Sequence, residues 1–436
     1  RAFALGLTLA LLLGLLPGGA PAPFAFAKEL ETPAVLEMQA SEEKPLTHQK
    51  LLVILVEFND VPIKYDCDFW SRQVFSTDPN DISVVNYWKE NANGLDIFEP
   101  ADTSGITIGK SGVTDTEYFV ENLADIPYTI DECSDGVVKV ILDMPHPVKN
   151  RFDGQTDGMD DKAAVLAIRA IGSNIDLSRE MPHIVTILAG YAAGGNGEGE
   201  WEIRGHVPLG PIATPDGTML GAITVHGEQW EKAAIGIGEI CHELGHSVFN
   251  LPDLYFGSVI GASPNCGVCS YSLMSSGSSG HLCNSSMAPG TPLKLGELPT
   301  HLDAWSKIQC GFVSPTVVNE WDGAVNSISE NGIDSKYNVL EVRSKADPNQ
   351  YFLIENRQLI GYDRGLQEAN NYYAGDVEIG GGIIIWHIDE SVSKNHNSSQ
   401  RYHTFMWAER STNKWSPTEW AYTGEAGRNT FDGKTT

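Results

Sequence analysis

Unbroken apolar runs along this chain predict buried β-strands. Residues 51–58 and 184–189 are nearly continuous stretches of Leu, Val, Ile and Ala, as expected for strands that are covered on both faces of a sheet. Residues 351–357 and 382–389 are also β-rich, and Gly, Asn and Asp turns separate them. The pattern therefore predicts a buried sheet early in the chain and a β-dominated region after Gly311.

Three further segments have the composition or spacing of apolar residues that is typical of helices. Residues 85–91 predict a short helix, and residues 161–171 predict an Ala-rich amphipathic helix. A third helix is predicted over Ala233 to Phe249, where Gly236 and Gly238 weaken the first turns but allow close packing.

Length and charge narrow the range of partners. The chain has 436 residues, enough for a large core and more than one domain. Its 57 acidic and 29 basic residues give a net charge of −28, which argues against nucleic acid and anionic membranes because both attract basic patches. The Gly-rich stretch 190–199 lacks a phosphate-binding motif, so we expect a surface loop there rather than a nucleotide site.

The N-terminal segment has the pattern of a secretory signal peptide. An apolar run from Ala2 to Leu16 follows Arg1, and Ala25-Phe26-Ala27 resembles a cleavage site. The run is short for a membrane span, although an uncleaved anchor is the alternative reading. We predict a signal peptide at 1–27, a linker or short prosegment at 28–48, and a secreted, extracellular protein with no stable membrane association after cleavage.

The candidate chemistry lies in the third predicted helix, at His242-Glu243-Leu244-Gly245-His246. Histidines four residues apart lie on one face of a helix. Both imidazoles can therefore bind one zinc ion, and Glu243 can reach a water on that ion. The alternative is a pair of histidines on a solvated helix face.

The residues after this motif favour a third zinc ligand. Asn250 tolerates the left-handed conformation and Pro252 cannot continue a helix, so the chain should turn there. The turn would bring the Asp253 carboxylate back to the two imidazoles as a zinc ligand. The alternatives are that Asp253 caps the turn or hydrogen-bonds a histidine. Met274, in a Ser/Gly-rich turn, fits the place of a Met-turn, or else fills the core.

Together these motifs resemble the immune inhibitor A family of secreted bacterial metallopeptidases. The resemblance rests on residues 242–246, 251–255 and 273–277, and it extends over residues 50–390. It implies an α+β fold: a metzincin-like zinc peptidase catalytic domain at 49–312, with a twisted mixed sheet and an active-site helix, followed by a β-rich C-terminal domain at 313–436. It also implies structural calcium in many members, for which no ligand is assigned here.

The activity that the resemblance implies is zinc-dependent hydrolysis of peptide bonds in protein or peptide substrates. Zinc would lower the pKa of a bound water to about 7, with Glu243 as general base and then general acid. In the metzincin pattern the third ligand comes six residues after the second histidine, whereas Asp253 comes seven after His246. The alternatives are a zinc-binding but inactive surface-binding or adhesin-like module, which the intact Glu243 argues against, and a zinc hydrolase of non-peptide amides.

Several other residues near the motif are weaker candidates. His301, Tyr255 and Tyr271 lie close to it in sequence as possible oxyanion partners, but a structural role is favoured for each. No catalytic role is assigned to His206, and His387 is expected to be structural.

The seven cysteines are scattered along the chain. Cys266, Cys269 and Cys283 cluster after the motif and favour one or two disulfides over a metal knuckle. Cys241 lies inside the motif helix and is expected to pack as a small buried thiol.

Overall fold

The structure is a computed structural model, and its described residues all belong to one compact unit, residues 43–436. Among them, no helix combines the length and apolar character needed to cross a membrane. The predicted signal peptide lies outside the described residues, as does the predicted linker before Thr47. The structure describes residues 47–103, 110–113, 126–133, 136–147, 159–172, 182–192, 203, 205–207, 212–213, 219–220, 223–230, 233–254, 268–280, 296–318, 328–331, 336–343, 346–366, 381–392 and 406–408.

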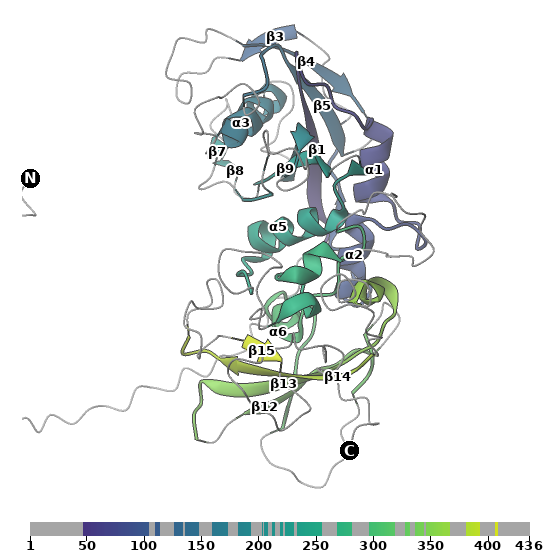
Figure 1. The fold of residues 1–436 in the computed structure, drawn as a ribbon, viewed down its shortest axis with the longest axis vertical. Coiled ribbons are helices and arrows are strands. Elements are labelled where there is room, and N and C mark those ends of the chain that lie inside the picture. Colours follow the sequence, from purple (N-terminus) through teal and green to yellow (C-terminus); the bar gives the residue numbers. More distant parts are fainter. Residues whose placement is uncertain are drawn as a thin grey trace, which may run out of the picture. The chain divides into compact units, whose positions relative to one another are not determined.

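The first sheet is built around β1 (Gln49–Phe58), the strand predicted at 51–58 (Figure 1). Parallel neighbours flank it, β5 (Val137–Leu142) on one side and β6 (His183–Tyr191) on the other. β9 (Ile223–Trp230) pairs in parallel with β6, and β10 (Ala233–Ala234) pairs with β9 in antiparallel. The remaining strands are β2 (Phe98–Pro100) on β1, β4 (Ile126–Glu132) and β3 (Lys110–Val113) beyond β5, and the separate pair β7 (Ile212–Ala213) and β8 (Met219–Leu220).

Alternate side chains of β1 enter two hydrophobic clusters, because successive residues of a strand point to opposite faces. Leu52, Ile54 and Val56 pack in the cluster that contains α3 (Met159–Gly172). Leu51, Val53 and Leu55 pack in the cluster that contains α1 (Cys67–Phe75), α2 (Val84–Asn91) and α5 (Ile237–Phe249). All six side chains are fully buried, which is why the apolar run has no polar positions between them.

The predicted motif helix is wrong at its start. Ala233–Ala234 forms β10, which pairs with the end of β9, and α5 begins only at Ile237. The glycines that follow are used for close packing. A Cβ at Gly236 would lie 2.1 Å from the carbonyl carbon of Gly296, and one at Gly238 would lie 1.9 Å from the Ser278 oxygen.

The second sheet follows the short helix α6 (Ala304–Gln309). Its strand order is β11-β12-β13-β14-β15, parallel between β11 and β12 and antiparallel elsewhere. Leu55 of the first sheet, Cys241 of α5 and Trp386 of β14 share one hydrophobic cluster. The predicted domain boundary at 312/313 stays a prediction. The strands are β11 (Thr316–Val318), β12 (Leu340–Arg343), β13 (Gln350–Arg357), β14 (Gly382–Asp389) and β15 (Met406–Ala408).

A disulfide joins Cys67 at the start of α1 to Cys133 at the end of β4. Because 66 residues separate the two cysteines, no local sequence pattern marks this pair. Of the predicted cluster, Cys266, Cys283 and the side chain of Cys269 lie outside the described residues. Cys241 is a free, buried thiol, as predicted.

A buried carboxylate of β9 holds the loop after β1. Glu228 is fully buried, and its Oε1 accepts hydrogen bonds from the backbone N–H groups of Lys64 (2.8 Å) and Tyr65 (2.7 Å). Burial raises its pKa from 4.5 to about 7, although these hydrogen bonds oppose the shift. The native protein therefore binds a proton at Glu228 more tightly than the unfolded chain does.

This shift predicts a pH-dependent stability difference between the wild type and Glu228→Gln. Below about pH 4.5 the carboxyl is protonated in both states, so the stabilisation from the raised pKa is fully present there and is lost as pH rises through about 7. Between pH 4 and pH 8 the free energy of unfolding of the wild type should therefore fall by about 3 kcal/mol relative to that of Glu228→Gln. Urea titrations across this range measure it, and a pH-independent difference would contradict the assignment.

Candidate metal centre

The end of α5 sets the geometry of the candidate site. The helix continues to Phe249, and Asn250 takes the left-handed conformation (φ 54°, ψ 33°), as predicted. The backbone N–H of Asn250 donates to the His246 oxygen (3.0 Å), and that of Leu251 donates to the Gly245 oxygen (3.1 Å). The extra residue relative to the metzincin spacing is therefore accommodated by the helix end, and the chain still turns back toward the histidines.

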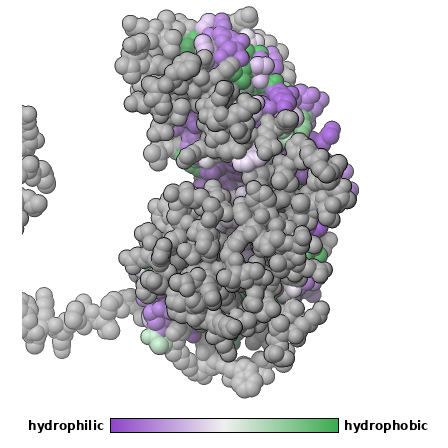
Figure 2. Space-filling model, viewed as in Figure 1, coloured by the Kyte–Doolittle hydropathy of each residue, from purple (hydrophilic) through white to green (hydrophobic). Residues whose placement is uncertain are grey.

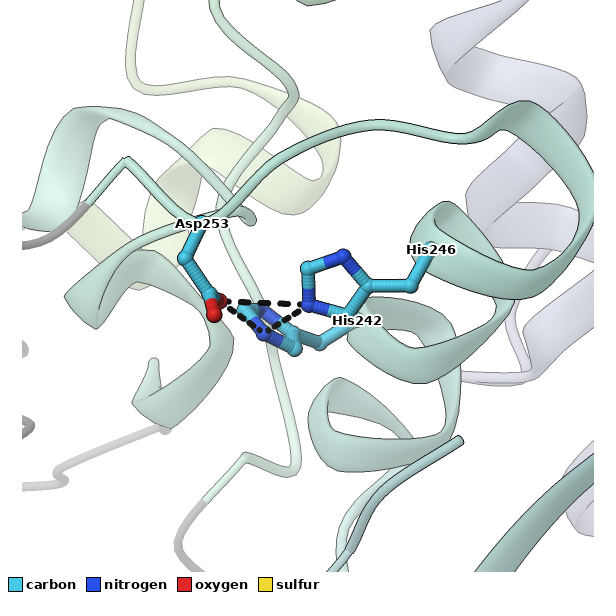
Figure 3. A group of neighbouring side chains, drawn as sticks. All are labelled: His242, His246 and Asp253. Carbon is cyan, nitrogen blue, oxygen red and sulfur yellow. Dashed lines mark hydrogen bonds and ion pairs between the residues drawn. The ribbon is translucent and has the colours of Figure 1, made fainter. Parts of the chain in front are cut away.

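The structure brings His242, His246 and Asp253 together (Figure 3). The two Nε2 atoms lie 3.0 Å apart, and Asp253 Oδ1 lies 3.1 Å from each of them. Their side chains are 9%, 22% and 16% exposed. Three donor atoms therefore form a nearly equilateral triangle in a mostly buried position.

Backbone carbonyls determine which nitrogen of each ring faces this triangle. His242 Nδ1 lies 2.8 Å from the Leu273 oxygen, and His246 Nδ1 lies 2.6 Å from the Leu251 oxygen. A carbonyl oxygen only accepts, so each Nδ1 must carry the hydrogen and donate. In a neutral imidazole the lone pair is then on Nε2, which is the atom that faces the other ring and Asp253.

The donor set fits a zinc ion. Two imidazole nitrogens and one carboxylate oxygen are a ligand set of catalytic zinc sites, which keep a fourth position open. Bonds of about 2.0–2.1 Å at tetrahedral angles place ligand atoms about 3.3 Å apart, close to the 3.0–3.1 Å edges found here. The hydrogen bonds from both Nδ1 atoms supply the outer support that metal-bound histidines need.

The same geometry can hold a proton in place of a metal. Burial lowers the pKa of His242, but hydrogen bonding to Asp253 and the nearby charge of Glu243 more than offset it, so the pKa rises to about 9. Burial raises the pKa of Asp253, but its hydrogen bonds with His242 and His246 outweigh this and hold it well below its ordinary value. Three lone pairs at this separation repel one another, so the centre needs a positive charge.

Glu243 is buried beside this centre, with 7% of its surface exposed. Among the described residues, no hydrogen bond or ion pair engages its carboxylate. Its charge contributes to the raised pKa of His242, which places it close to that ring. A buried carboxylate without a protein partner is suited to accept a proton from a water or substrate group.

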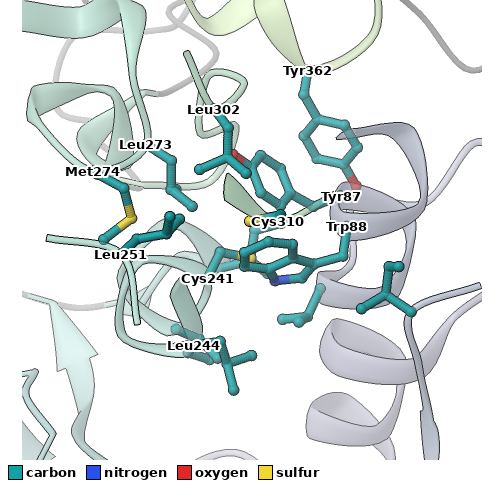
Figure 4. Packing of buried hydrophobic residues seen from close by; sticks show 14 of the residues in the cluster. Tyr87, Trp88, Cys241, Leu244, Leu251, Leu273, Met274, Leu302, Cys310 and Tyr362 are labelled. Carbon is teal, nitrogen blue, oxygen red and sulfur yellow. The ribbon is translucent and has the colours of Figure 1, made fainter. Parts of the chain in front are cut away.

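Met274 of the predicted Met-turn packs with Leu251 and Leu273 in the hydrophobic cluster that contains α5 (Figure 4). Met274 is fully buried, and its sulfur packs so closely on α5 that a Cβ at Gly245 would lie 2.6 Å from it. Its backbone oxygen accepts a hydrogen bond from the N–H of Leu254 (2.8 Å), the residue after Asp253. The turn therefore contacts α5 and also holds the segment that carries the third candidate ligand.

Two of the weaker oxyanion candidates, His301 and Tyr271, are buried in contacts with other residues. His301 is fully buried, with Nε2 2.6 Å from Glu90 Oε1 and Nδ1 3.1 Å from Lys307 Nζ. Tyr271 is buried, its ring packs against Trp386, and burial raises its pKa to about 12. Tyr255 lies outside the described residues.

His206 and His387 have protein partners elsewhere. His387 Nε2 lies 3.1 Å from Gln350 Oε1 on the second sheet. His206 Nε2 lies 2.7 Å from Asp161 Oδ1, and with Asp160 these residues form a second group of converging ligand atoms among the described residues. The His206–Asp161 hydrogen bond accounts for that group without a metal.

The surface is hollowed at the level of α5, and the described residues visible there are mainly hydrophilic (Figure 2).

No protein-family model matches the chain, and no curated protein matches it. Among solved structures, wild-type OgpA from Akkermansia muciniphila matches in one crystal form at 14% identity and a TM-score of 0.26, covering 81% of this chain and 87% of that chain. A second crystal form matches at 14% identity and a TM-score of 0.25, covering 83% and 90%. Similarity at this level carries no argument about function.

Proposed function

We propose that this chain is a zinc-dependent endopeptidase in which His242, His246 and Asp253 hold the metal. One observation carries the proposal: two imidazole nitrogens and a carboxylate oxygen lie 3.0–3.1 Å from one another. The helix α5, which ends in a left-handed residue, and the turn around Met274 bring these atoms together. Both lie in the region that is predicted to be a metzincin-like catalytic domain.

In the proposed reaction Glu243 moves the proton. Zinc held by His242, His246 and Asp253 would be the Lewis acid that polarises the scissile carbonyl and lowers the pKa of water. The Glu243 carboxylate takes a proton from the water that attacks the carbonyl carbon. It then delivers that proton to the amine nitrogen as the carbon–nitrogen bond breaks. The Leu273 and Leu251 carbonyls keep both rings oriented throughout.

Export is part of the proposal. The predicted signal peptide at 1–27 supports it, and so does the Cys67–Cys133 disulfide, since such bonds persist mainly in oxidising compartments. The proposed substrates are proteins or peptides outside the cell. Structural calcium remains an expectation from the family resemblance alone, with no ligand assigned.

Metal analysis paired with casein zymography tests the proposal. The purified chain should contain about one zinc per molecule and clear casein. Clearing should stop with a zinc chelator and return when zinc is added back. Bound zinc without clearing of casein or of any peptide library would instead indicate a zinc-binding surface module. Activity confined to small non-peptide amides would indicate the other class of zinc hydrolase.

A further inference from the structure

A buried ion pair in the second half of the chain lies behind the metal centre. Arg357, at the end of β13, binds Asp363 through two hydrogen bonds, Nε to Oδ2 at 2.5 Å and Nη2 to Oδ1 at 2.6 Å. Asp363 belongs to the short helix η3 (Gly361–Arg364). Arg357 is 1% exposed and Asp363 is fully buried. A bidentate pair of this kind fixes direction as well as distance.

The pair also holds backbone from outside the second sheet. Arg357 Nη1 donates to the backbone carbonyl oxygens of Tyr271 (3.1 Å) and Leu302 (3.3 Å). Asp363 Oδ1 accepts from the His301 N–H (2.9 Å). Two segments far apart in sequence, one entering the Met-turn and one preceding α6, are therefore bound to the same guanidinium–carboxylate unit.

From these segments, two further hydrogen bonds reach the metal centre. The Leu273 N–H donates to the His301 oxygen (3.1 Å), and the Leu273 oxygen accepts the hydrogen of His242 Nδ1 (2.8 Å). The pair thus holds the backbone of Tyr271, two residues before Leu273, and that of His301, whose oxygen accepts from the Leu273 N–H. Each link from the ion pair to His242 is therefore a direct hydrogen bond or a short stretch of backbone.

We propose that Arg357 and Asp363 are positioning residues for the metal centre and that the second sheet is part of the catalytic unit. The inference rests on the proposed zinc function. An ion pair with both partners buried adds little net stability, because the cost of desolvation offsets the attraction. Its geometric effect is the larger one here, since a ligand histidine must be held in orientation by its outer hydrogen bond.

Zinc affinity of the folded full chain tests this role. Arg357→Lys keeps the charge but loses the planar fork, and Asp363→Asn keeps the shape but loses the charge. Each should weaken zinc binding by about 10- to 100-fold, the usual effect of removing outer support, measured by competition with a chromophoric chelator. Tyr337→Phe is the matched control: it removes a buried hydrogen bond to Glu355 (2.5 Å) in the same network but leaves in place the hydrogen bonds of Arg357 and Asp363 described above. It should leave zinc affinity within about twofold of the wild type.

The outcomes separate this inference from the proposed function. Tight zinc binding by the wild type and equally tight binding by folded Arg357→Lys and Asp363→Asn would overturn the positioning role alone. A wild type that binds no zinc would overturn both. If neither variant folds, hydrogen exchange of the wild type decides: zinc should protect the amides of Leu273 and His301 more than that of Val53 in β1, and equal protection would overturn the role.

Discussion

Glu243→Gln should remove peptide hydrolysis and leave zinc bound. The amide has nearly the shape of the carboxylate but cannot accept the proton of the attacking water. General acid–base catalysis contributes about 10²–10⁴-fold, so kcat should fall by that factor with little change in KM. Steady-state assays on a peptide substrate measure the fall in kcat, and metal analysis of the same samples shows whether zinc is retained.

Glu239→Gln is the matched control for this variant. Glu239 lies one turn earlier on α5, and its side chain pairs with His226 at 3.2 Å. The substitution makes the same chemical change on the same helix, and activity should stay close to that of the wild type. A Glu243→Gln protein that keeps more than about a tenth of wild-type activity with full zinc would show that another group moves the proton.

Local patterns predicted the parts of the fold that depend on local physics. The apolar run at 51–58 predicted β1 because both of its faces are covered, by α3 and by the helices of the other cluster. Asn250 predicted the end of α5 because it adopts a left-handed backbone at little cost. His242 and His246 were recognisable because a helix alone places them on one face.

Contacts between distant segments were not predictable in this way. The helix start at Ile237 depends on how closely Gly236 and Gly238 approach segments far along the chain. The Leu273 oxygen that orients His242 is a backbone group, so no residue type marks it. Arg357 was missed for a related reason: in sequence it is an ordinary arginine in a β segment, and only the packing of the second sheet on the backbone of Tyr271 and Leu302 reveals its role.

Replacing Asp253 should separate a zinc ligand from a residue that only caps the turn. Asp253→Asn keeps an oxygen and a similar shape but loses the negative charge, while Asp253→Ala loses the donor altogether. As a ligand, Asp253 contributes one of three protein bonds to a zinc ion whose total binding free energy is about 10–16 kcal/mol. Losing one bond should cost on the order of 4 kcal/mol, or about 10³-fold in zinc affinity.

Stability measurements make this difference visible without any substrate. At a zinc concentration about 1,000 times the wild-type Kd, bound metal stabilises the native state by about 4 kcal/mol. At the same concentration, a variant with about 10³-fold weaker binding gains only about 0.4 kcal/mol. Urea unfolding of Asp253→Ala with and without buffered zinc should therefore show almost no metal effect, and Asp253→Asn should fall well below the wild type. If Asp253→Asn kept the full gain from zinc, the carboxylate charge would not be acting on the metal, and the centre would be a two-histidine site with Asp253 as a hydrogen-bonding neighbour.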